Sequence, residues 1–350
     1  MTEIIPRVCI DGREVDFLKG TYANPGNLSA ATISFDLSIS EGVTKKLWNK
    51  EVTFYLSQND TVPIFRGWIK RTKPTLNQIT ILAEDGLGYM VKGGEMEKAK
   101  VVLDNFSNID GLTIGTAITK LLELSKLNNK VKTDYIGDTS PKISSSSLYI
   151  RGEVSVMGTI KSLLQKAINK GGNIPRPNIA KLIDDGTNSQ LVIELESDLD
   201  SDTVVHTFTE HDNIAKIDIV NRKVPTVVTV TGKNGVSGRF THDTALEAYD
   251  RNFLQATNDT LESPAECRDF AMKLFEANLK LQYEYAVQVF EGAYLSENEV
   301  IRVHTDEPEY AGNYRVIGKK INFSPNGFSI GLSINKKPPT LAEYIASRDN

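Results

Sequence analysis

Short runs of alternating apolar and polar side chains fill the first 98 residues of the chain. Because successive side chains of a strand point to opposite faces of a sheet, this alternation predicts β-strands. The expected strands are Arg7–Ile10, Val15–Lys19, Thr32–Ser38, Glu51–Leu56, Ile64–Thr72 and Ile79–Ala83. Turn-forming pairs such as Asp11-Gly12 and Lys73-Pro74 separate them. Residues 1–98 are therefore predicted to form a small antiparallel barrel or sandwich.

The spacing of apolar residues changes in the middle of the chain, at about residues 99–205. Helical periodicity follows two potential N-cap residues, Thr113 and Ser155. The predicted apolar faces are Ile114, Ala117, Ile118, Leu121 and Leu122 in the first helix, and Ile160, Leu163, Leu164, Ala167 and Ile168 in the second. A strand is expected at Leu148–Gly152, and a hairpin at Ala180–Ile183 and Leu191–Leu195. This stretch is predicted to be a small mixed α/β module.

Alternation returns in residues 206–350, where one long helix interrupts it. Strands are expected at Ile214–Val220, Thr226–Thr231 and Tyr283–Phe290. The sequence Ser263-Pro-Ala-Glu266 combines an N-cap, a proline at the first helical position and a capping-box glutamate. A helix is therefore predicted over residues 263–281, and a similar capping box at Thr340 predicts a short terminal helix.

Two widely separated stretches, residues 51–82 and 299–334, share one pattern. In both, Glu-Val opens a strand, an acidic turn follows, and an aromatic-Arg pair begins the next strand. A Lys-Arg or Lys-Lys pair and a Pro-containing turn then lead into a third alternating strand. In this alignment Trp68 corresponds to Ile317, and both fit core positions. The duplication predicts two similar barrels in one chain, which favours assembly over catalysis.

Composition limits the functions that the chain can serve. Hydrophobic residues make up 40% of the 350 residues and charged residues 24%, which is typical of globular domains. The net charge of −5 argues against a basic nucleic-acid-binding surface. Cys9 and Cys267 lack the clustering that a zinc site needs, and a disulfide between them is not favoured. The sequence shows neither a signal-peptide pattern nor an apolar run long enough to cross a membrane.

Two clusters of polar residues could hold a cation, but a plainer interpretation is favoured for each. His206 and His211 flank Glu210 and lie near Asp212, with irregular spacing unlike that of helical zinc ligands. Residues 196–202 are rich in carboxylates but lack the fixed glycine and the terminal glutamate of a calcium loop. A surface strand and a solvated turn are expected instead, so neither a metal site nor a cofactor is predicted.

The repeat also supplies matched basic residues that are candidates for a subunit interface. They are Arg66, Lys70 and Arg71 in the first copy and Arg315, Lys319 and Lys320 in the second. Exposed strand charges can simply block edge-to-edge aggregation. Alternatively, they pair across a ring interface with acidic loops such as Asn59-Asp60 or Asp306-Glu307. Both hypotheses stay open at this point.

Catalytic motifs are missing from the sequence. It contains no Gly-x-Ser-x-Gly elbow, no P-loop and no paired Cys-His motif, so an enzyme is not predicted. A cell-wall hydrolase remains an alternative because it needs only two facing carboxylates. A carbohydrate- or receptor-binding module is another, although Trp48 and Trp68 are the only tryptophans.

Four segments together resemble a known family. They are Phe65–Ile69 with Ile79–Asp85, Thr113–Leu122, Leu148–Gly172, and Ser263–Leu281 with Glu299–Ile334. In this order they resemble the tail and baseplate hub proteins of tailed phages, also called late-control-D-like proteins, which have relatives in contractile injection systems. The resemblance implies a mainly β chain with an α/β insert. Its domains would be a tube-like antiparallel barrel (1–98), the insert (99–205) and a second tube-like barrel with the long helix (206–350).

The resemblance also implies a function in assembly. Three subunits would form a homotrimeric, pseudo-sixfold ring that adapts the sixfold tail tube to a threefold spike or fibre. The expected partners are other copies of the chain, the tail tube or distal tail protein, a spike or fibre on a separate polypeptide, and baseplate wedge proteins. DNA would pass through the channel without specific binding, and the chain would insert into no membrane. Such a protein is assembled in the host cytoplasm and resides in the virion.

Overall fold

The computed structural model describes residues 5–26, 29–38, 47–88, 100–102, 109–134, 136, 142–143, 153–166, 178–219, 225–243, 246, 251–258, 261–282, 284–308 and 310–336. The chain divides into two compact units, each assembled from separate segments. Unit 1 comprises Met1–Asp198, Gln288–Glu299 and Ile317–Leu332, and unit 2 comprises Leu199–Val287, Val300–Val316 and Ser333–Asn350. This division does not test the three domains expected from the sequence, at residues 1–98, 99–205 and 206–350, which stay a prediction.

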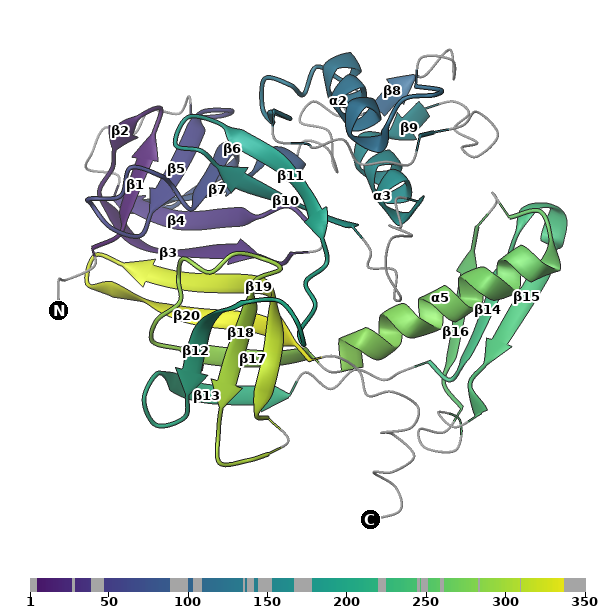
Figure 1. The fold of residues 1–350 in the computed structure, drawn as a ribbon. Coiled ribbons are helices and arrows are strands. Elements are labelled where there is room, and N and C mark those ends of the chain that lie inside the picture. Colours follow the sequence, from purple (N-terminus) through teal and green to yellow (C-terminus); the bar gives the residue numbers. More distant parts are fainter. Residues whose placement is uncertain are drawn as a thin grey trace. The chain divides into compact units, whose positions relative to one another are not determined.

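Six N-terminal strands of unit 1 overlap their predicted positions (Figure 1). The one predicted at Val15–Lys19 extends instead to Asn24, and a two-residue strand at Arg13–Glu14 was not predicted. The strands of this region are β1 (Arg7–Ile10), β2 (Arg13–Glu14), β3 (Phe17–Asn24), β4 (Thr32–Ser38), β5 (Glu51–Tyr55), β6 (Phe65–Pro74) and β7 (Gln78–Glu84). Strand β4 shows why the alternation is informative, because Ile33, Phe35 and Leu37 are all buried. Its neighbour Asp36 is also buried and accepts a hydrogen bond from Thr80 at 2.7 Å. This carboxylate is therefore compensated by a polar partner.

The stretch predicted as an α/β module combines helices and strands in unit 1. It contains β8 (Lys100–Val102), α2 (Ile114–Leu124), β9 (Glu153–Ser155), α3 (Val156–Lys166), β10 (Asn178–Asp184) and β11 (Ser189–Leu195). Thr113 caps α2 as predicted, because its side chain accepts a hydrogen bond from the Thr116 backbone nitrogen. Strands β10 and β11 form the predicted hairpin. The strand expected at Leu148–Gly152, the residues Ala167 and Ile168, and the terminal helix at Thr340 lie outside the described residues.

Helices α2 and α3 share a hydrophobic core with the sheet of unit 1. The apolar faces of both helices are buried in it, together with Ala180 and Leu191 of the hairpin. Trp68 of β6 belongs to the same cluster and is only 6% exposed. The Lys130 ammonium lies 4.2 Å from the centre of the Trp68 ring, a cation–π contact. Trp68 thus anchors the α/β module to the sheet, which agrees with its interpretation as a core residue.

Unit 2 includes a small mixed sheet covered by the long helix (Figure 1). Strands β14 (Val227–Thr231), β15 (Ser237–Thr241) and β16 (Phe253–Thr257) pair in the order β15-β14-β16, and β14–β16 is a parallel pair. Helix α5 (Pro264–Gln282) packs on this sheet through Cys267, Ala271 and Phe275. The capping box is confirmed, because Ser263 and Glu266 exchange hydrogen bonds with each other's backbone nitrogens.

The remaining strands belong, with the N-terminal ones, to a single 13-stranded sheet. They are β12 (Val204–Thr209), β13 (Ile214–Ile219), β17 (Glu284–Val289), β18 (Val300–His304), β19 (Gly312–Ser324) and β20 (Gly327–Asn335). The strand order is β13-β17-β20-β19-β3-β4-β7-β6-β5-β1-β2, and β18 pairs with both β12 and β19. The mainly β class is confirmed. The two β-rich regions are nevertheless not separate sheets, because β3 pairs with β19.

The repeated stretches form meanders with the same connectivity. Strand β6 lies between β5 and β7, and β19 pairs with both β18 and β20. The cross-strand register differs by one residue: Thr53 faces Arg66 in the first copy, whereas Ile301 faces Tyr314 in the second. A register irregularity between Ile69 and Arg71 also interrupts the β6–β7 ladder. The repeat is therefore equivalent in topology but not residue for residue.

Gly238 of β15 lies where helix α5 approaches the small sheet most closely. A Cβ at this position would lie 2.4 Å from the Arg268 backbone nitrogen and 2.6 Å from the Pro264 carbonyl oxygen. We expect Gly238→Ala to lower the free energy of unfolding by about 1–3 kcal/mol, because the helix must shift outward. Denaturant unfolding measures this change, with the exposed neighbour variant Ser237→Ala as the control. Equal losses in the two variants would contradict the close approach.

Both cysteines are buried and free, so no disulfide joins them. Cys267 belongs to the core under α5, and burial raises the pKa of the Cys9 thiol. Neither thiol therefore has the exposed, electropositive surroundings of a reactive cysteine. Within the described part of the chain, no helix combines the length and the apolarity that a bilayer span requires.

Candidate functional site

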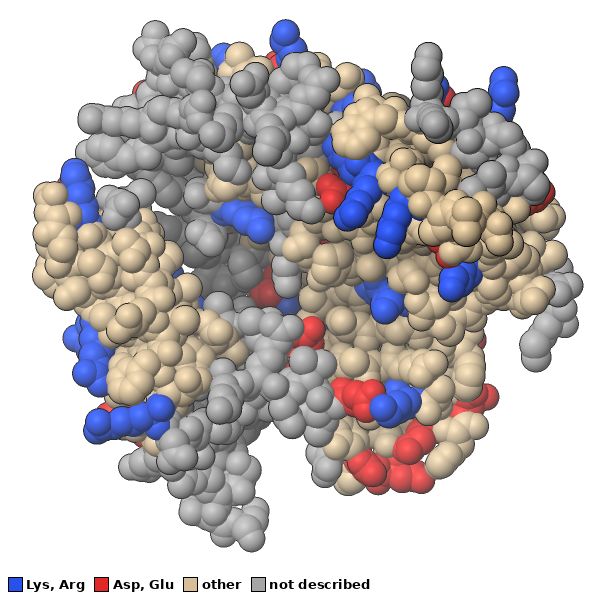
Figure 2. Space-filling view, turned by 180° about the vertical axis from the view of Figure 1, so that it is seen from behind, with Lys and Arg blue, Asp and Glu red and all other residues tan. Residues whose placement is uncertain are grey.

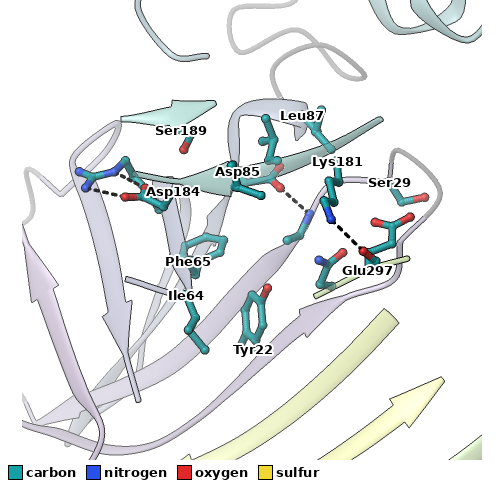
Figure 3. Close-up of a pocket in the computed structure, with 15 residues that line it drawn as sticks. Tyr22, Ser29, Ile64, Phe65, Asp85, Leu87, Lys181, Asp184, Ser189 and Glu297 are labelled. Atoms are coloured by element: carbon teal, nitrogen blue, oxygen red, sulfur yellow. Dashed lines mark hydrogen bonds and ion pairs between the residues drawn. The ribbon is translucent and has the colours of Figure 1, made fainter. Parts of the chain in front are cut away.

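A polar pocket lies in unit 1, between the β10–β11 hairpin and the sheet (Figure 3). Its lining comes from β3, the start of β6, the end of β7, the hairpin and the loop before β18. The lining residues are Tyr22, Asn24, Ser29, Ala31, Ile64, Phe65, Arg66, Asp85, Leu87, Lys181, Leu182, Ile183, Asp184, Ser189 and Glu297. Five segments distant in sequence therefore converge on one small volume.

Asp85 is the most deeply buried carboxyl group of this pocket. Burial raises its pKa to about 7, although hydrogen bonds from backbone N–H groups oppose the shift. Its two oxygens accept hydrogen bonds from Ala31 N at 3.0 Å and Gly88 N at 3.2 Å. Both oxygens are thus engaged in joining the segment before β4 to the end of β7. This arrangement suits a structural bracket better than a proton donor for a substrate.

Arg66 forms the principal ion-pair network at the pocket. Its Nε lies 2.6 Å from an Asp184 carboxylate oxygen, and its Nη1 lies 2.7 Å from Glu51. Nη2 also donates to the Gly186 carbonyl oxygen at 3.1 Å. The side chains of Arg66 and Asp184 are only 9% and 6% exposed. The guanidinium therefore locks the hairpin onto strands β5 and β6.

Lys181 makes a second link on the other side of the pocket. Its ammonium lies 2.8 Å from Glu194 and donates to the Glu297 carbonyl oxygen at 3.1 Å. Figure 3 shows the Lys181–Glu297 and Arg66–Asp184 contacts as dashed lines. These charged side chains are already paired inside the unit. The pocket is consequently a junction at which paired charges join the hairpin, the sheet and the loop before β18.

Asp85 should contribute a decrease in the free energy of unfolding as pH rises from about 4 to about 7. Asp85 keeps its proton up to about pH 7 in the folded chain, whereas an unfolded aspartate releases it near pH 3.9. Between these values the folded state binds more protons, so a rise in pH favours unfolding. We expect Asp85→Asn to flatten this dependence when unfolding is measured at several pH values. Parallel pH curves for the wild type and the variant would contradict this assignment.

The six matched basic residues occupy different environments. Arg66 is paired internally, and the Lys319 ammonium donates to the carbonyl oxygens of Ala293 and Leu295 at 2.7 and 2.9 Å. Burial lowers the pKa of Lys319 to about 8. Arg71 and Lys320 are exposed, while Lys70 and Arg315 are half-buried. The structure therefore does not gather the six residues into one site, and their role at an interface stays a prediction.

The polar cluster around His211 is located in unit 2. Potential ligand atoms of Glu210, His211 and Asp306 lie within 4.8 Å of one another. The His211 and Asp306 side chains are 78% and 92% exposed, with Nε2 and Oδ2 separated by 3.7 Å. One Glu210 oxygen already accepts hydrogen bonds from the Thr305 hydroxyl and the Asp306 backbone nitrogen. Asp212 and His206 are not part of the group, so the cluster is best described as a hydrogen-bonded surface turn.

Figure 2 shows charged side chains of both signs on one face. Several basic side chains lie close together in one part of this face, and most of its acidic side chains gather in another.

Comparison with known proteins identifies the class of fold. No family model matches the sequence, and none of the curated proteins matches it. The fold is similar to that of a tail protein from Neisseria meningitidis MC58, with a TM-score of 0.66 and 15% identity over 95% of this chain and 96% of that one. It is also similar to the 43 kDa tail protein of prophage MuSo2 from Shewanella oneidensis, with a TM-score of 0.64 and 11% identity over 94% and 97% of the two chains.

A third similar structure comes from a secretion system. It is the Escherichia coli c3393 protein, described as a component of the type VI secretion system with structural similarity to the T4 phage tail proteins gp27 and gp5. The TM-score is 0.53 with 10% identity, covering 95% of this chain and 79% of that one. The chain thus has the fold of phage tail proteins, and the resemblance to tail hub proteins is confirmed at the level of fold.

Sequence reasoning missed several residues that organise the site. Asp184 and Glu51 form ion pairs with Arg66. Asp85 accepts hydrogen bonds that join the segment before β4 to the end of β7. The sequence offers one weak signal for this pair: Arg66 follows the apolar Phe65 at the start of a strand. A charged residue at such a position can be partly buried and then needs an acidic partner. The identity of a partner 118 residues away was not encoded locally.

Proposed function

We propose that this chain is a structural hub protein of a phage tail tip or baseplate. The observation that carries the proposal is the fold likeness to two phage-type tail proteins, which extends over nearly the whole length of both chains in each comparison. The E. coli secretion component adds support, because its own likeness to gp27 and gp5 relates this fold to tail proteins of phage T4. The internally paired charges of the pocket also favour a structural role over an enzymatic one.

The finer proposal is a homotrimeric ring. Each subunit would contribute two tube-like barrels, so three subunits would present six similar positions to the sixfold tail tube and three to a spike or fibre. The common connectivity of β5–β6–β7 and β18–β19–β20 supports this internal pseudo-symmetry. The matched basic residues would contribute to the contacts between subunits, with the exposed Arg71 and Lys320 most accessible for them.

The proposed partners follow from this position in the tail. One face would bind the tail tube or distal tail protein, another the spike or fibre, and the periphery the baseplate wedge proteins. The net charge of −5 suits a channel through which DNA passes without binding. The domains at 1–98, 99–205 and 206–350 would correspond to the first barrel, the insert and the second barrel.

Electron microscopy of assembled tails tests the proposal. A label attached to an exposed position of the chain is expected only at the tail tip or baseplate. A label distributed along the tube, or absent from finished tails, would contradict the hub role. Hydrolysis of purified peptidoglycan that is abolished by one carboxylate substitution would instead establish the cell-wall hydrolase.

A further inference from the structure

Strand β6 of unit 1 ends in an exposed hairpin. Residues 71–77, at the junction of β6 and β7, are all exposed, and Leu76 at the turn is 96% exposed. We call residues 70–78 the hairpin tip. It carries Lys70, Arg71 and Lys73 and contains no acidic residue. The tip therefore presents one bare apolar side chain among three cationic ones.

The hairpin tip has a defined conformation. The β6–β7 ladder extends to the pair Pro74–Ile79. Thr75 and Gln78 close the turn through three hydrogen bonds: Thr75 N and Oγ1 donate to the Gln78 carbonyl oxygen, and Gln78 N donates to Thr75 Oγ1, at 2.8 to 3.3 Å. A turn held in this way loses little conformational entropy when it binds, which favours affinity.

A complementary surface lies at the opposite end of β6. Three loops meet there, residues 57–64, 184–188 and 290–296, and we call them the acidic patch. Tyr294 Oη donates to the Asp60 carboxylate at 3.0 Å, and a Cβ on Gly186 would lie 3.8 Å from Val62 Cγ2. The hydrogen bond joins the first loop to the third, and the short distance shows that the second loop lies beside the first.

The acidic patch combines apolar surface with negative charge. Val62 and Tyr294 are 45% and 58% exposed, and Asp60, Asp185 and Glu291 lie in the same loops. No lysine or arginine occurs in the three segments, although Arg7 and Arg66 reach them from neighbouring strands and donate to the Asp60 and Gly186 carbonyl oxygens at 2.9 and 3.1 Å. The carboxylates of Asp185 and Glu291 remain at the surface as the negative charges of the patch. Lys319 fixes the third loop from below by donating to two of its carbonyl oxygens. The patch, like the hairpin tip, is therefore preorganised.

We propose that the hairpin tip of one subunit docks on the acidic patch of a second copy of this chain. Leu76 would cover Val62 and the Tyr294 ring, while Lys70, Arg71 and Lys73 would face the carboxylates. The two surfaces cannot meet within one subunit, because a ten-residue strand separates them by roughly 30 Å. The contact is therefore head-to-tail, the type that closes rings.

This inference rests on the proposed hub role only for the number of subunits in the ring. A single exposed leucine is common on protein surfaces, and basic residues on a hairpin also protect a strand edge. The docking contact predicts something that these two explanations do not. If the hairpin tip binds the acidic patch, substitutions at either end of β6 change the same association constant. Charge reversal at both ends distinguishes these possibilities.

The test measures self-association of the full chain by analytical ultracentrifugation over a concentration series. We expect Leu76→Asp to weaken association at least about tenfold. Lys73→Glu and Glu291→Lys should each weaken it, and the double variant should recover much of the loss because the charges again attract. Lys126→Glu, a reversal at an exposed position outside both surfaces, is the matched control and should leave association unchanged. Unchanged thermal unfolding shows that each variant folds.

Three results would overturn the contact. If the wild type associates and all hairpin and patch variants associate equally well, docking between copies is wrong while the hub role stands. If the variants still associate but no longer bind tail-tube protein, the occupant of the patch is a different protein. If the double variant loses as much association free energy as the two single variants together, a direct charge contact is excluded.

Discussion

Arg66→Ala should lower the free energy of unfolding by about 3–5 kcal/mol, because it leaves a buried carboxylate without its cation. The side chain of Asp184 is only 6% exposed, and Arg66 supplies its bidentate partner. The same substitution removes the hydrogen bond that ties Gly186 to β6. Chemical denaturation followed by circular dichroism measures the loss.

A double variant distinguishes the loss of the ion pair from a general disruption of packing at the site. In Arg66→Met combined with Asp184→Leu, neither buried charge remains, and Glu51 is exposed enough to be hydrated. Replacement of a buried pair by apolar residues is often nearly neutral, so the double variant should be more stable than Arg66→Ala. A single variant with a loss below about 1 kcal/mol, as at exposed pairs, would show that water reaches this junction.

Trp68→Ala should also destabilise the chain by about 3–5 kcal/mol, the usual range for a buried tryptophan. The indole is 6% exposed and packs in the core that α2, α3 and the β10–β11 hairpin share. The chain provides a matched control, because its other tryptophan, Trp48, is 64% exposed. Trp48→Ala should change the free energy of unfolding by less than about 0.5 kcal/mol.

Denaturant unfolding of both variants tests whether the α/β module packs on β6. Each variant keeps one tryptophan, so the remaining fluorescence reports on a buried site in one case and on an exposed site in the other. Similar losses in the two variants would contradict the anchoring role of Trp68. A reduced denaturant slope in Trp68→Ala would add that the module has detached from the sheet, because less surface then becomes exposed on unfolding.

Features encoded by neighbouring residues were the most predictable. The caps at Thr113 and Ser263 follow from local hydrogen bonding between a side chain and the next turn. The strand β4 was predicted with its observed bounds, because its alternation matches a sheet with one buried face. Local patterns of this kind do not depend on the rest of the fold.

Short strands with a special packing task escaped prediction. Strand β15 contains Gly238, which weakens the strand signal but is the residue that lets helix α5 approach. Strand β16 exposes Phe253 and alternates over only five residues, so its pattern carries little information. For Gly238 the reason for the residue is a tertiary contact, which the sequence pattern does not show.

Long-range pairing could not be derived from the sequence. The pairing of β3 with β19 brings together segments from opposite ends of the chain, and neither strand specifies its partner. The burial of Arg66 and Lys319 was likewise hidden, because a basic residue on a strand looks the same whether it faces water or an internal acceptor. The candidate interface residues were thus predicted as a group but differ in environment.

The mass of the chain in solution tests the hub proposal most directly. Native mass spectrometry, alone and after addition of tail-tube protein, should detect a species with three times the subunit mass of 38.7 kDa. A chain that remains strictly monomeric in both conditions would contradict the trimeric hub.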